Sequence, residues 1–471
     1  MKLREARKNS FIKPGSKLDL FLIRQLGSSQ FSYWEIFSML LPLILDSFFI
    51  NIINLLTTAM ISSSSQESVS AVSLVSPLYM MIYAVFNAIA AGGTVIVAQY
   101  KGRDDKEKIR ASAGQVMLAT SVSAIVLCAC LIIFAHPLVS TFFGAAEQTV
   151  REKAEDYLIG VSLSFMFHSF YMGSFAVFRG LGETKICLHL TVIINLIHLF
   201  ASMLFINILH LDIYGTILSY NLARIIGASI AVYLLLRSKN PFRVYVKDLL
   251  HIDISILKSI FKVGIPFALE QVFFNGGSML VQTYIVHLGT ISVAANAISN
   301  SAFSIIYAAG LAVGTLAITI VGQCVGAGDK ELAKKYGSKM IWLGTFITIL
   351  SILVFLPLMP LILKLYQAPV DTLSLIYQLI FIAVVPMPFF WSMSNIMPCV
   401  FRSAGDANFS SISSLITMWV VRVGLGYVFA LPLGMGVHGV WICMGIEWAV
   451  RTVIYYLRFR SDVWLTKKTI D

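Results

Sequence analysis

Apolar residues form long stretches along most of the chain, and short polar segments separate them. A helix that crosses the hydrocarbon core of a membrane needs about 20 consecutive, mainly apolar residues. Twelve stretches meet this requirement, at 34–62, 69–99, 113–135, 156–179, 186–207, 213–237, 261–288, 292–322, 337–363, 374–401, 409–431 and 435–458. The pattern therefore predicts an all-α integral membrane protein with twelve transmembrane helices.

The polar segments predict how these helices are organised. Residues 1–33 and 459–471 are polar ends, and a third polar segment at 238–260 divides the helices into two sets of six. We expect an N-lobe at 34–237 and a C-lobe at 261–458. Because each set contains an even number of helices, both ends of the chain lie on one side of the membrane.

Composition excludes a soluble or disordered protein and orients the chain. Charged residues make up 13% of the sequence, about half of what a soluble domain carries. Of 35 Lys and Arg residues, 29 fall in segments on the side of the termini, three fall on the opposite side, and three lie within predicted helices. Basic loops favour the cytoplasm. We therefore expect both termini inside an inner-membrane protein, and the net charge of +11 requires no nucleic-acid partner.

The two halves of the chain repeat each other at a nearly constant offset. Matching residues stand 224 apart, or 223 after one gap, which is a spacing that duplication explains. The matched pairs are Pro42 with Pro266, Asp46 with Glu270, Asn51 with Asn275, Gln99 with Gln323, Gly102 with Gly326, and Phe178-Arg179 with Phe401-Arg402. Six helices per unit give both copies the same orientation in the membrane. The sequence thus predicts two pseudo-symmetric six-helix bundles that face a central cavity.

Several of these segments are similar to a known transporter family. The runs 95–102 and 321–329, the two Phe-Arg turns, and the segments 418–422 and 447–451 resemble the multidrug and toxin extrusion (MATE) family, in its bacterial form. The resemblance implies a two-lobed antiporter that exports cationic or amphipathic organic compounds against inward Na⁺ or H⁺. It implies no other cofactor, and we expect a monomer in the lipid bilayer.

Two acidic residues within the predicted helices are candidates for the ion-coupling site. Asp46 and Glu270 lie well inside apolar stretches and are repeat equivalents. A charged side chain at the centre of a membrane costs about 2.5–3.5 kcal/mol or more, so it needs a reason to be there. Either carboxylate can hold Na⁺, take up a proton or bind a cationic substrate. The alternative is a carboxylate whose hydrogen bonds are satisfied within the helix bundle.

Polar and aromatic residues on neighbouring helices predict the substrate cavity. Polar side chains recur every three or four residues along the first and seventh predicted helices, and other candidates come from the fourth, fifth and tenth. The candidates are Asn51, Asn54, Thr57, His168, Asn195, Gln271, Asn275, Gln282 and Trp391. The alternative for each residue is interhelical hydrogen bonding or packing.

The sequence departs from the family pattern at the positions of the ion-site acids. The acids that many members place at the ion site correspond here to Thr57, Leu199, Phe274 and Trp391. None of these residues is a carboxylate, so the resemblance leaves the choice between Na⁺ and H⁺ open.

Other function classes are weighed against transport of this kind. A lipid-linked saccharide flippase of the same superfamily is the first alternative, although such proteins often have extra helices and a strongly cationic cavity. A membrane-embedded enzyme is the second. The sequence contains no HExxH, Gly-x-Ser-x-Gly or Walker A motif, which argues against an enzyme or an ATP-driven pump. Its six cysteines show no metal-ligand spacing, so we expect buried free thiols and no protein-ligated metal.

Overall fold

The computed structural model describes residues 15–27, 30–61, 65–144, 146–237 and 244–470, and the chain is helical in all of its long elements. We use the names N-lobe and C-lobe for the two predicted halves of the chain. The first half contains α3 (Tyr33–Ile61), α4 (Gln66–Gly102), α5 (Lys106–Ile133), α6 (Ala135–Phe143), α7 (Gln148–Leu181), α8 (Thr184–Ser202), η2 (Met203–Ile208) and α9 (Asp212–Arg237). The second half contains α11 (Ile254–Val286), α12 (Thr290–Gly326), α13 (Lys330–Phe355), α14 (Met359–Leu365), α15 (Val370–Val384), η3 (Met387–Trp391), α16 (Ser392–Ser403), α17 (Ala407–Thr417), η4 (Met418–Leu425), α18 (Gly426–Ala430) and α19 (Gly436–Arg460).

The predicted fold class is confirmed, because each of the twelve apolar stretches corresponds to helical elements of the structure. Within the described residues, ten helices are long and apolar enough to cross a membrane, and α15 with η3 and α16 forms an eleventh, bent span. The remaining stretch is α11, which has 33 residues and carries the polar side chains Glu270, Gln271, Asn275 and Gln282.

Some predicted spans are interrupted where a proline or a π-helical turn falls. The predicted span 374–401 bends by 41° between Val384 and Met387, where Pro386 and Pro388 remove backbone donors. By contrast, Pro42 and Pro266 lie inside unbroken helices. The predicted span 113–135 corresponds to α5, and the predicted span 337–363 corresponds to α13 and the start of the short helix α14.

Two loops that match in the repeat begin helices in the same way. Gly102 and Gly326 end α4 and α12. Three residues later, the Asp105 carboxylate accepts the backbone N–H of Lys108 at 3.0 Å, and the Asp329 carboxylate accepts that of Leu332 at 2.9 Å. Each Asp therefore caps the next helix, α5 or α13, by accepting a backbone donor that the helix leaves unpaired.

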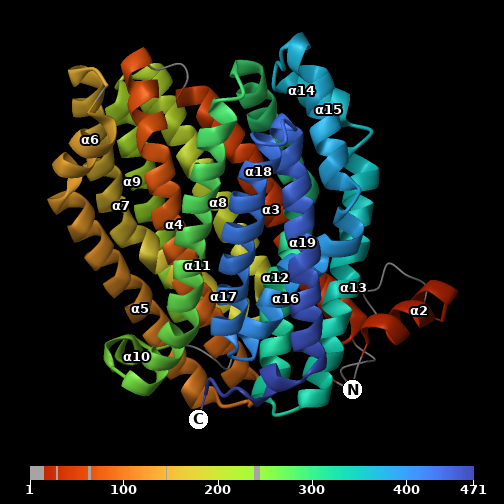
Figure 1. The fold of residues 1–471 in the computed structure, drawn as a ribbon. Helices are drawn as coiled ribbons and strands as arrows, with labels where there is room; N and C mark the ends of the chain where they lie inside the picture. Colours follow the sequence, from red (N-terminus) through yellow and green to blue (C-terminus); the bar gives the residue numbers. More distant parts are fainter. Residues whose placement is uncertain (1–14, 28–29, 62–64, 145, 238–243, 471) are drawn as a thin grey trace.

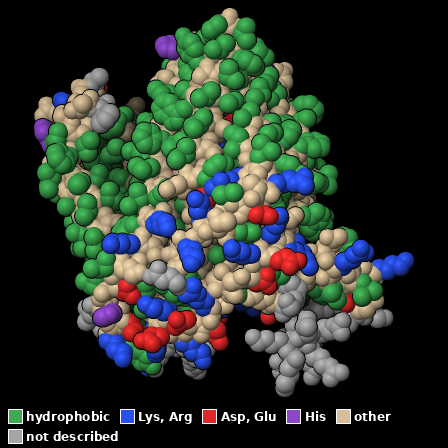
Figure 2. All heavy atoms as spheres, turned by 60° about the horizontal axis from the view of Figure 1, so that its bottom comes forward, with side chains coloured by type: hydrophobic (Ala, Val, Ile, Leu, Met, Phe, Trp, Pro, Cys, Tyr) green, Lys and Arg blue, Asp and Glu red, His purple; other side chains and the backbone are tan. Residues whose placement is uncertain are grey.

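The described parts of the two polar ends, which include α2 (Lys17–Leu26) and the segment after α19, lie at one end of the helix bundle, which we call the terminal end (Figure 1). The helix α10 (Val246–Leu250) lies there too, while α6 and α14 lie at the opposite end (Figure 1). Figure 2 shows the face at the terminal end, on which basic and acidic side chains gather below a mostly apolar flank. This charge distribution matches a bundle whose terminal end projects from a membrane.

The two lobes are in close contact near the terminal end, mainly through α4 against α11 and α12. Gly102 and Gly326 permit this approach: a Cβ atom on Gly102 would lie 2.0 Å from the Gln323 carbonyl oxygen, and one on Gly326 would lie 1.9 Å from the Gln99 carbonyl oxygen. Only glycine fits two backbones this close together.

Two glutamines that match in the repeat, one from each lobe, stabilise this contact with hydrogen bonds to the other lobe. Gln99 donates from Nε2 to the Ser403 carbonyl at 2.7 Å, and Gln323 donates to the Gly180 carbonyl at 3.1 Å. We call this contact, with its two glycines and two glutamines, the terminal seal. The C-terminal tail lies against it, since Thr469 is buried and lies 3.5 Å from Gln99 Nε2.

Candidate functional site

The two acids predicted for ion coupling each form an ion pair with an arginine of their own lobe. Asp46 lies 3.5 Å from Nη2 of Arg179, and Glu270 lies 2.7 Å from Nη2 of Arg402. The acids lie in the middle of α3 and α11, and the arginines lie in the last turns of α7 and α16. Both acids and both arginines are repeat equivalents, so one ion pair was present before the duplication or arose in both halves.

The arginines of these pairs make contacts that the sequence did not predict. Arg179 and Arg402 were counted among the basic residues on the side of the termini, at the end of the predicted stretches 156–179 and 374–401, but each belongs to a helix and points toward a buried carboxylate. Each guanidinium also lies over an aromatic ring, that of Phe175 at 4.1 Å or Phe267 at 3.7 Å from the ring centroid. Asp46 and Glu270 are therefore not free carboxylates in this conformation.

A third buried acid, Glu447 on α19, lies between two arginines. Its Oε2 is 2.5 Å from Nε of Arg422 on η4, and its Oε1 contacts Nη2 of Arg451 one helical turn away. Arg451 also donates to the hydroxyl of Thr417 at 3.1 Å. This C-lobe cluster holds one more positive than negative charge.

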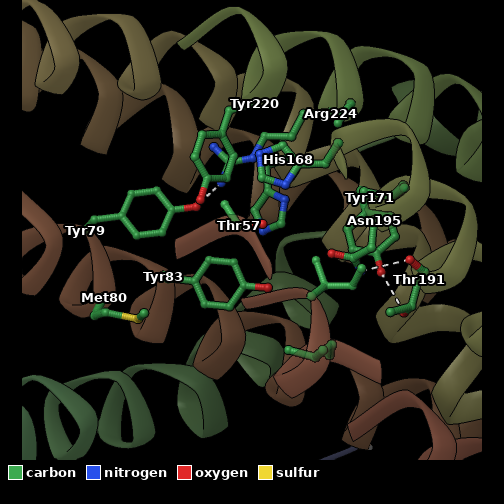
Figure 3. A pocket seen from close by; sticks show the side chains of 15 residues that line it. Thr57, Tyr79, Met80, Tyr83, His168, Tyr171, Thr191, Asn195, Tyr220 and Arg224 are labelled. Atoms are coloured by element: carbon green, nitrogen blue, oxygen red, sulfur yellow. Dashed lines mark hydrogen bonds between the residues drawn. The ribbon is translucent and has the colours of Figure 1, made fainter. Parts of the chain in front are cut away.

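The N-lobe contains a pocket of about 220 Å³ lined from α3, α4, α7, α8 and α9 (Figure 3). At its inner wall Arg224 donates hydrogen bonds to the hydroxyls of Ser164 and Tyr79. Its guanidinium also lies 5.2–5.5 Å from the ring centroids of Tyr79, Phe165 and Tyr220. Among the described residues, no Asp or Glu forms an ion pair with Arg224. We call this cavity the N-lobe pocket.

Three residues predicted for the substrate cavity line the N-lobe pocket, namely Thr57, His168 and Asn195. Thr57 Oγ1 and His168 Nε2 are buried, and neither has a hydrogen-bond partner within the described residues. Asn195 donates to the carbonyl of Thr191 at 2.8 Å. Thr191 faces both the pocket and the carboxyl group of Asp46, so it stands between the pocket and the Asp46–Arg179 pair.

The C-lobe has a pocket of the same volume, about 220 Å³, at the matching place in the repeat. Gln282 lines it and accepts a hydrogen bond from Asn296 at 3.0 Å. Thr57 lines the N-lobe pocket and its repeat equivalent Val281, 224 residues later, lines the C-lobe pocket, so the two linings differ in chemistry at this position. Duplication therefore produced two cavities whose linings have diverged.

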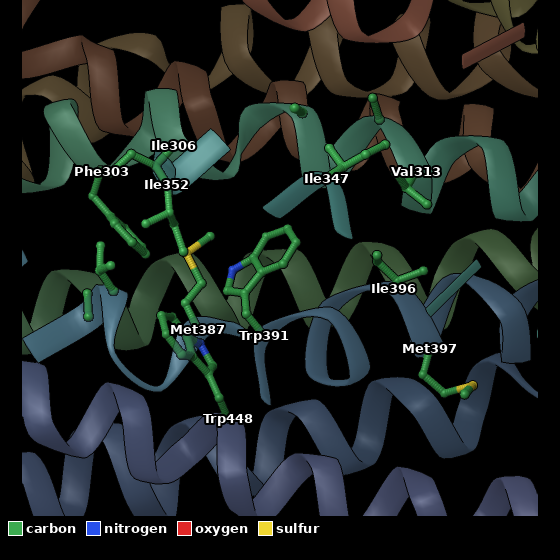
Figure 4. Close-up of a cluster of buried hydrophobic side chains, with 14 of the residues drawn as sticks. Phe303, Ile306, Val313, Ile347, Ile352, Met387, Trp391, Ile396, Met397 and Trp448 are labelled. Atoms are coloured by element: carbon green, nitrogen blue, oxygen red, sulfur yellow. The ribbon is translucent and has the colours of Figure 1, made fainter. Parts of the chain in front are cut away.

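The other predicted cavity residues whose side chains are described, Asn51, Gln271, Asn275 and Trp391, line neither pocket. Asn51 and Asn275 each donate to the carbonyl of the residue four positions earlier, at 2.8 Å, and Gln271 is half-buried beside that turn. The side chain of Asn54 lies outside the described residues. Trp391 is buried in the C-lobe core, stacked 6.0 Å from Tyr307 and packed against Gly310 (Figure 4).

Sequence reasoning missed the tyrosines that surround Arg224. Arg224 is one of the three basic residues that the sequence places within predicted helices, but the sequence analysis did not connect it with Tyr79, Tyr83 or Tyr220. A signal was available, because Tyr220 and Arg224 are four residues apart on one helix face. The residues of α4 and α7 that contact Arg224, namely Tyr79, Ser164 and Phe165, could be recognised only in the tertiary structure. The free cysteines were expected to be buried, whereas Cys130 is exposed.

Comparisons with known proteins support a transporter. A model of the MatE family matches residues 42–204 and 266–428, two ranges that stand 224 residues apart. The chain is 25% identical over 439 residues to "Uncharacterized transporter YisQ" of Bacillus subtilis, covering 92% of this chain and 95% of that protein. It is 23% identical to "Probable multidrug resistance protein NorM" of Thermotoga maritima, with 91% and 92% covered.

Solved structures share the fold at low sequence identity. An outward-facing multidrug resistance MATE transporter of the MOP superfamily superposes with a TM-score of 0.82 at 20% identity, covering 92% of this chain and 96% of that one. A MATE protein in a bent conformation superposes with the same TM-score at 19% identity, with 96% and 99% covered.

Proposed function

This chain belongs to the MatE family of membrane transporters, which are not enzymes, and on that premise we propose that it exports amphipathic organic compounds. Export proceeds by alternating access between the two lobes, coupled to inward Na⁺ or H⁺. The relatives named as probable multidrug resistance proteins support efflux of drug-like compounds.

The terminal seal is the observation that carries this proposal. Alternating access requires the lobes to close on one side of a substrate site and to open there in another state. The seal is built from two side-chain hydrogen bonds and backbone contacts between lobes, without a covalent link. Its glutamines donate to carbonyl groups that water can satisfy when the lobes part. The closed contact is therefore reversible at modest cost.

The basic residues support the orientation of the transport cycle. They gather at the terminal end (Figure 2), which we assign to the cytoplasm by the positive-inside rule. The seal then closes the cytoplasmic side, and this conformation is the one that releases substrate outward.

Asp46 is the better candidate of the two acids for ion coupling. Its ion pair with Arg179 is long, at 3.5 Å, and the Arg179 side chain is 25% exposed. Thr191 links it to the N-lobe pocket. Na⁺ or H⁺ can therefore compete with Arg179 for the Asp46 carboxylate. The Glu270–Arg402 pair is shorter, at 2.7 Å, and both side chains are buried, which suits a structural role.

Cationic cargo was expected from the family resemblance, and the placement of Asp46 and Glu270 within the predicted helices favoured it. Their pairing with arginines removes that reason, so the proposal keeps amphipathic cargo without requiring a positive charge. Two other arginines favour a second candidate, a flippase for a lipid-linked saccharide, because Arg224 and Arg422 line cavities within the lobes.

Efflux from proteoliposomes tests the proposal. We expect ethidium or naphthalene-2-carboxylate to leave at least about tenfold faster under an inward Na⁺ or proton gradient. Asp46→Asn should abolish the response to the gradient, because Asn cannot exchange a proton and binds Na⁺ weakly. Asp371→Asn, which removes an exposed acid at the start of α15, is the matched control. Efflux that ignores both gradients contradicts the antiporter proposal.

A further inference from the structure

We infer that the N-lobe pocket binds the anionic group of an amphipathic ligand, a carboxylate or a phosphate on an aromatic or apolar body, with Arg224 as its counter-ion. The inference rests on the proposed transport function and specifies the substrate class of its N-lobe pocket. Three features of the pocket carry it: an unpaired buried cation, unpartnered polar atoms and aromatic walls.

The first feature is the charge of Arg224. Arg224 is only 5% exposed. The two hydrogen bonds of its guanidinium go to the neutral hydroxyl groups of Ser164 and Tyr79. A guanidinium carries five N–H donors, so donors remain for a ligand. A buried cation without an anionic partner is costly to retain. Every other arginine described above that lies within a lobe faces a carboxylate. An anionic ligand would complete the same pairing at Arg224.

The second feature is a set of polar atoms without partners around Arg224. His168 and His198 are each 6% exposed, Thr57 is 7% exposed, and all three line the pocket. Within the described residues, His168 Nε2, His198 Nε2 and Thr57 Oγ1 have no hydrogen-bond partner. Buried polar atoms are nearly always paired. A neutral imidazole donates from Nε2 in one tautomer and a hydroxyl donates freely, so these groups can bind the oxygens of one anion.

The third feature is the aromatic wall, which favours an anion over a cation. Tyr79, Tyr83, Tyr171 and Tyr220 give the pocket flat apolar faces that suit an aromatic ligand body (Figure 3). Such faces also attract cations, but Arg224 already lies over the rings of Tyr79 and Tyr220. Among the described lining residues none is Asp or Glu. A second cation would meet repulsion from Arg224 and no carboxylate.

Binding of two matched probes to the purified full chain in phosphatidylcholine nanodiscs tests the inference. The probes are naphthalene-2-carboxylate and naphthalene-2-yl-trimethylammonium, which share a ring system and differ in charge. We expect the carboxylate to bind at least about tenfold more tightly. Arg224→Gln should weaken carboxylate binding by about 30-fold or more, and Arg224→Lys should restore part of it.

Arg237→Gln is the matched control, because it removes an exposed arginine from the same helix, outside the pocket. It should leave both affinities unchanged. Tighter binding of the ammonium probe by the unaltered protein overturns the inference. So does carboxylate binding that Arg224→Gln leaves intact.

A second measurement does not depend on how well the Arg224 variants fold. Thr57→Cys places a thiol in the pocket, and a methanethiosulfonate reagent should modify it. We expect naphthalene-2-carboxylate to protect this thiol and the ammonium probe to leave it reactive. Protection by the ammonium probe alone contradicts the inference.

Two further measurements are needed. The first distinguishes a lipid headgroup from a soluble anion, and the second distinguishes failure of the anion inference from failure of the proposed function. Dioleoyl phosphatidic acid in the nanodisc should displace the naphthoate if the anion is a lipid headgroup, whereas an unchanged affinity identifies a soluble solute. Gradient-driven efflux of ethidium without carboxylate binding would overturn the anion inference and leave the proposed function standing. Carboxylate binding without gradient-driven efflux of any probe would support the anion inference and overturn the proposed function.

Discussion

The buried carboxylates of Asp46 and Glu270 differ in how completely arginine neutralises them. Glu270 and Arg402 are both buried, whereas Arg179 beside Asp46 is partly exposed. Removing one partner of a buried pair leaves an unpaired charge in a medium of low polarity, which costs about 3–5 kcal/mol. A partly exposed partner regains water instead. The repeat equivalence of the acids therefore does not make them energetically equivalent.

Glu270→Gln should accordingly lower the free energy of unfolding in detergent by about 3–5 kcal/mol. Asp46→Asn should lower it by only about 1 kcal/mol. Thermal unfolding of the two variants beside the unaltered protein measures the difference. The double variant Glu270→Gln/Arg402→Gln removes both charges and should recover most of the loss. Equal losses for Asp46→Asn and Glu270→Gln would contradict this account.

The sequence predicts these charges but not their partners. Hydropathy alone marks Asp46 and Glu270 as exceptional, and the repeat marks them as equivalent. Their arginines lie 133 and 132 residues away along the chain, near helix ends where a count of basic residues assigns them to loops. A long, flexible side chain can reach inward from a helix end, and only the packed structure shows the direction that it takes.

At the scale of elements, α3 and α11 carry matching polar side chains on unbroken, proline-containing helices. Asn51 and Asn275 donate back to their own helices and line neither pocket. Helix positions were predictable because apolar length and the repeat agree. The breaks in the helices at η3 and η4 were harder to predict, because a π-helical turn has no reliable sequence pattern. Only the prolines at η3 marked one of these breaks in the sequence.

Cysteine labelling tests whether these asparagines face a water-filled space between the lobes. In a Cys130→Ser background, which removes the exposed native thiol, we expect Asn51→Cys and Asn275→Cys to react with a membrane-impermeant thiol reagent. Ser219→Cys, at a fully buried position in α9, should stay unmodified. Two unreactive sites in a folded, transporting protein would assign both asparagines to packing.

At the scale of the whole molecule, the terminal seal fixes which side of the bundle is closed. The approach of α4 to α12 depends on Gly102 and Gly326, where an added Cβ meets backbone oxygen at 2.0 Å and 1.9 Å. Backbone cannot move aside as a side chain can. A methyl group at either position must therefore separate the two lobes at this end.

Gly102→Ala should shift the conformational equilibrium toward a state open at the terminal end, by about 1–3 kcal/mol. Spin labels at Lys106→Cys and Lys330→Cys, two exposed matching positions on opposite lobes, report the separation. We expect a longer distance population to grow. Gly276→Ala is the matched control, since a Cβ there meets nothing within 4 Å. An unchanged distance distribution in Gly102→Ala would contradict the steric role of this glycine.

The terminal seal is reciprocal: each lobe gives one glutamine to a carbonyl of the other lobe and receives one in return. This is the contact pattern of an isologous interface between two identical subunits, in which residue i meets residue j and residue j meets residue i. The seal thus preserves the geometry of a twofold homodimer within a single chain. The contact between the lobes can therefore stay symmetric while each half carries its own pocket chemistry.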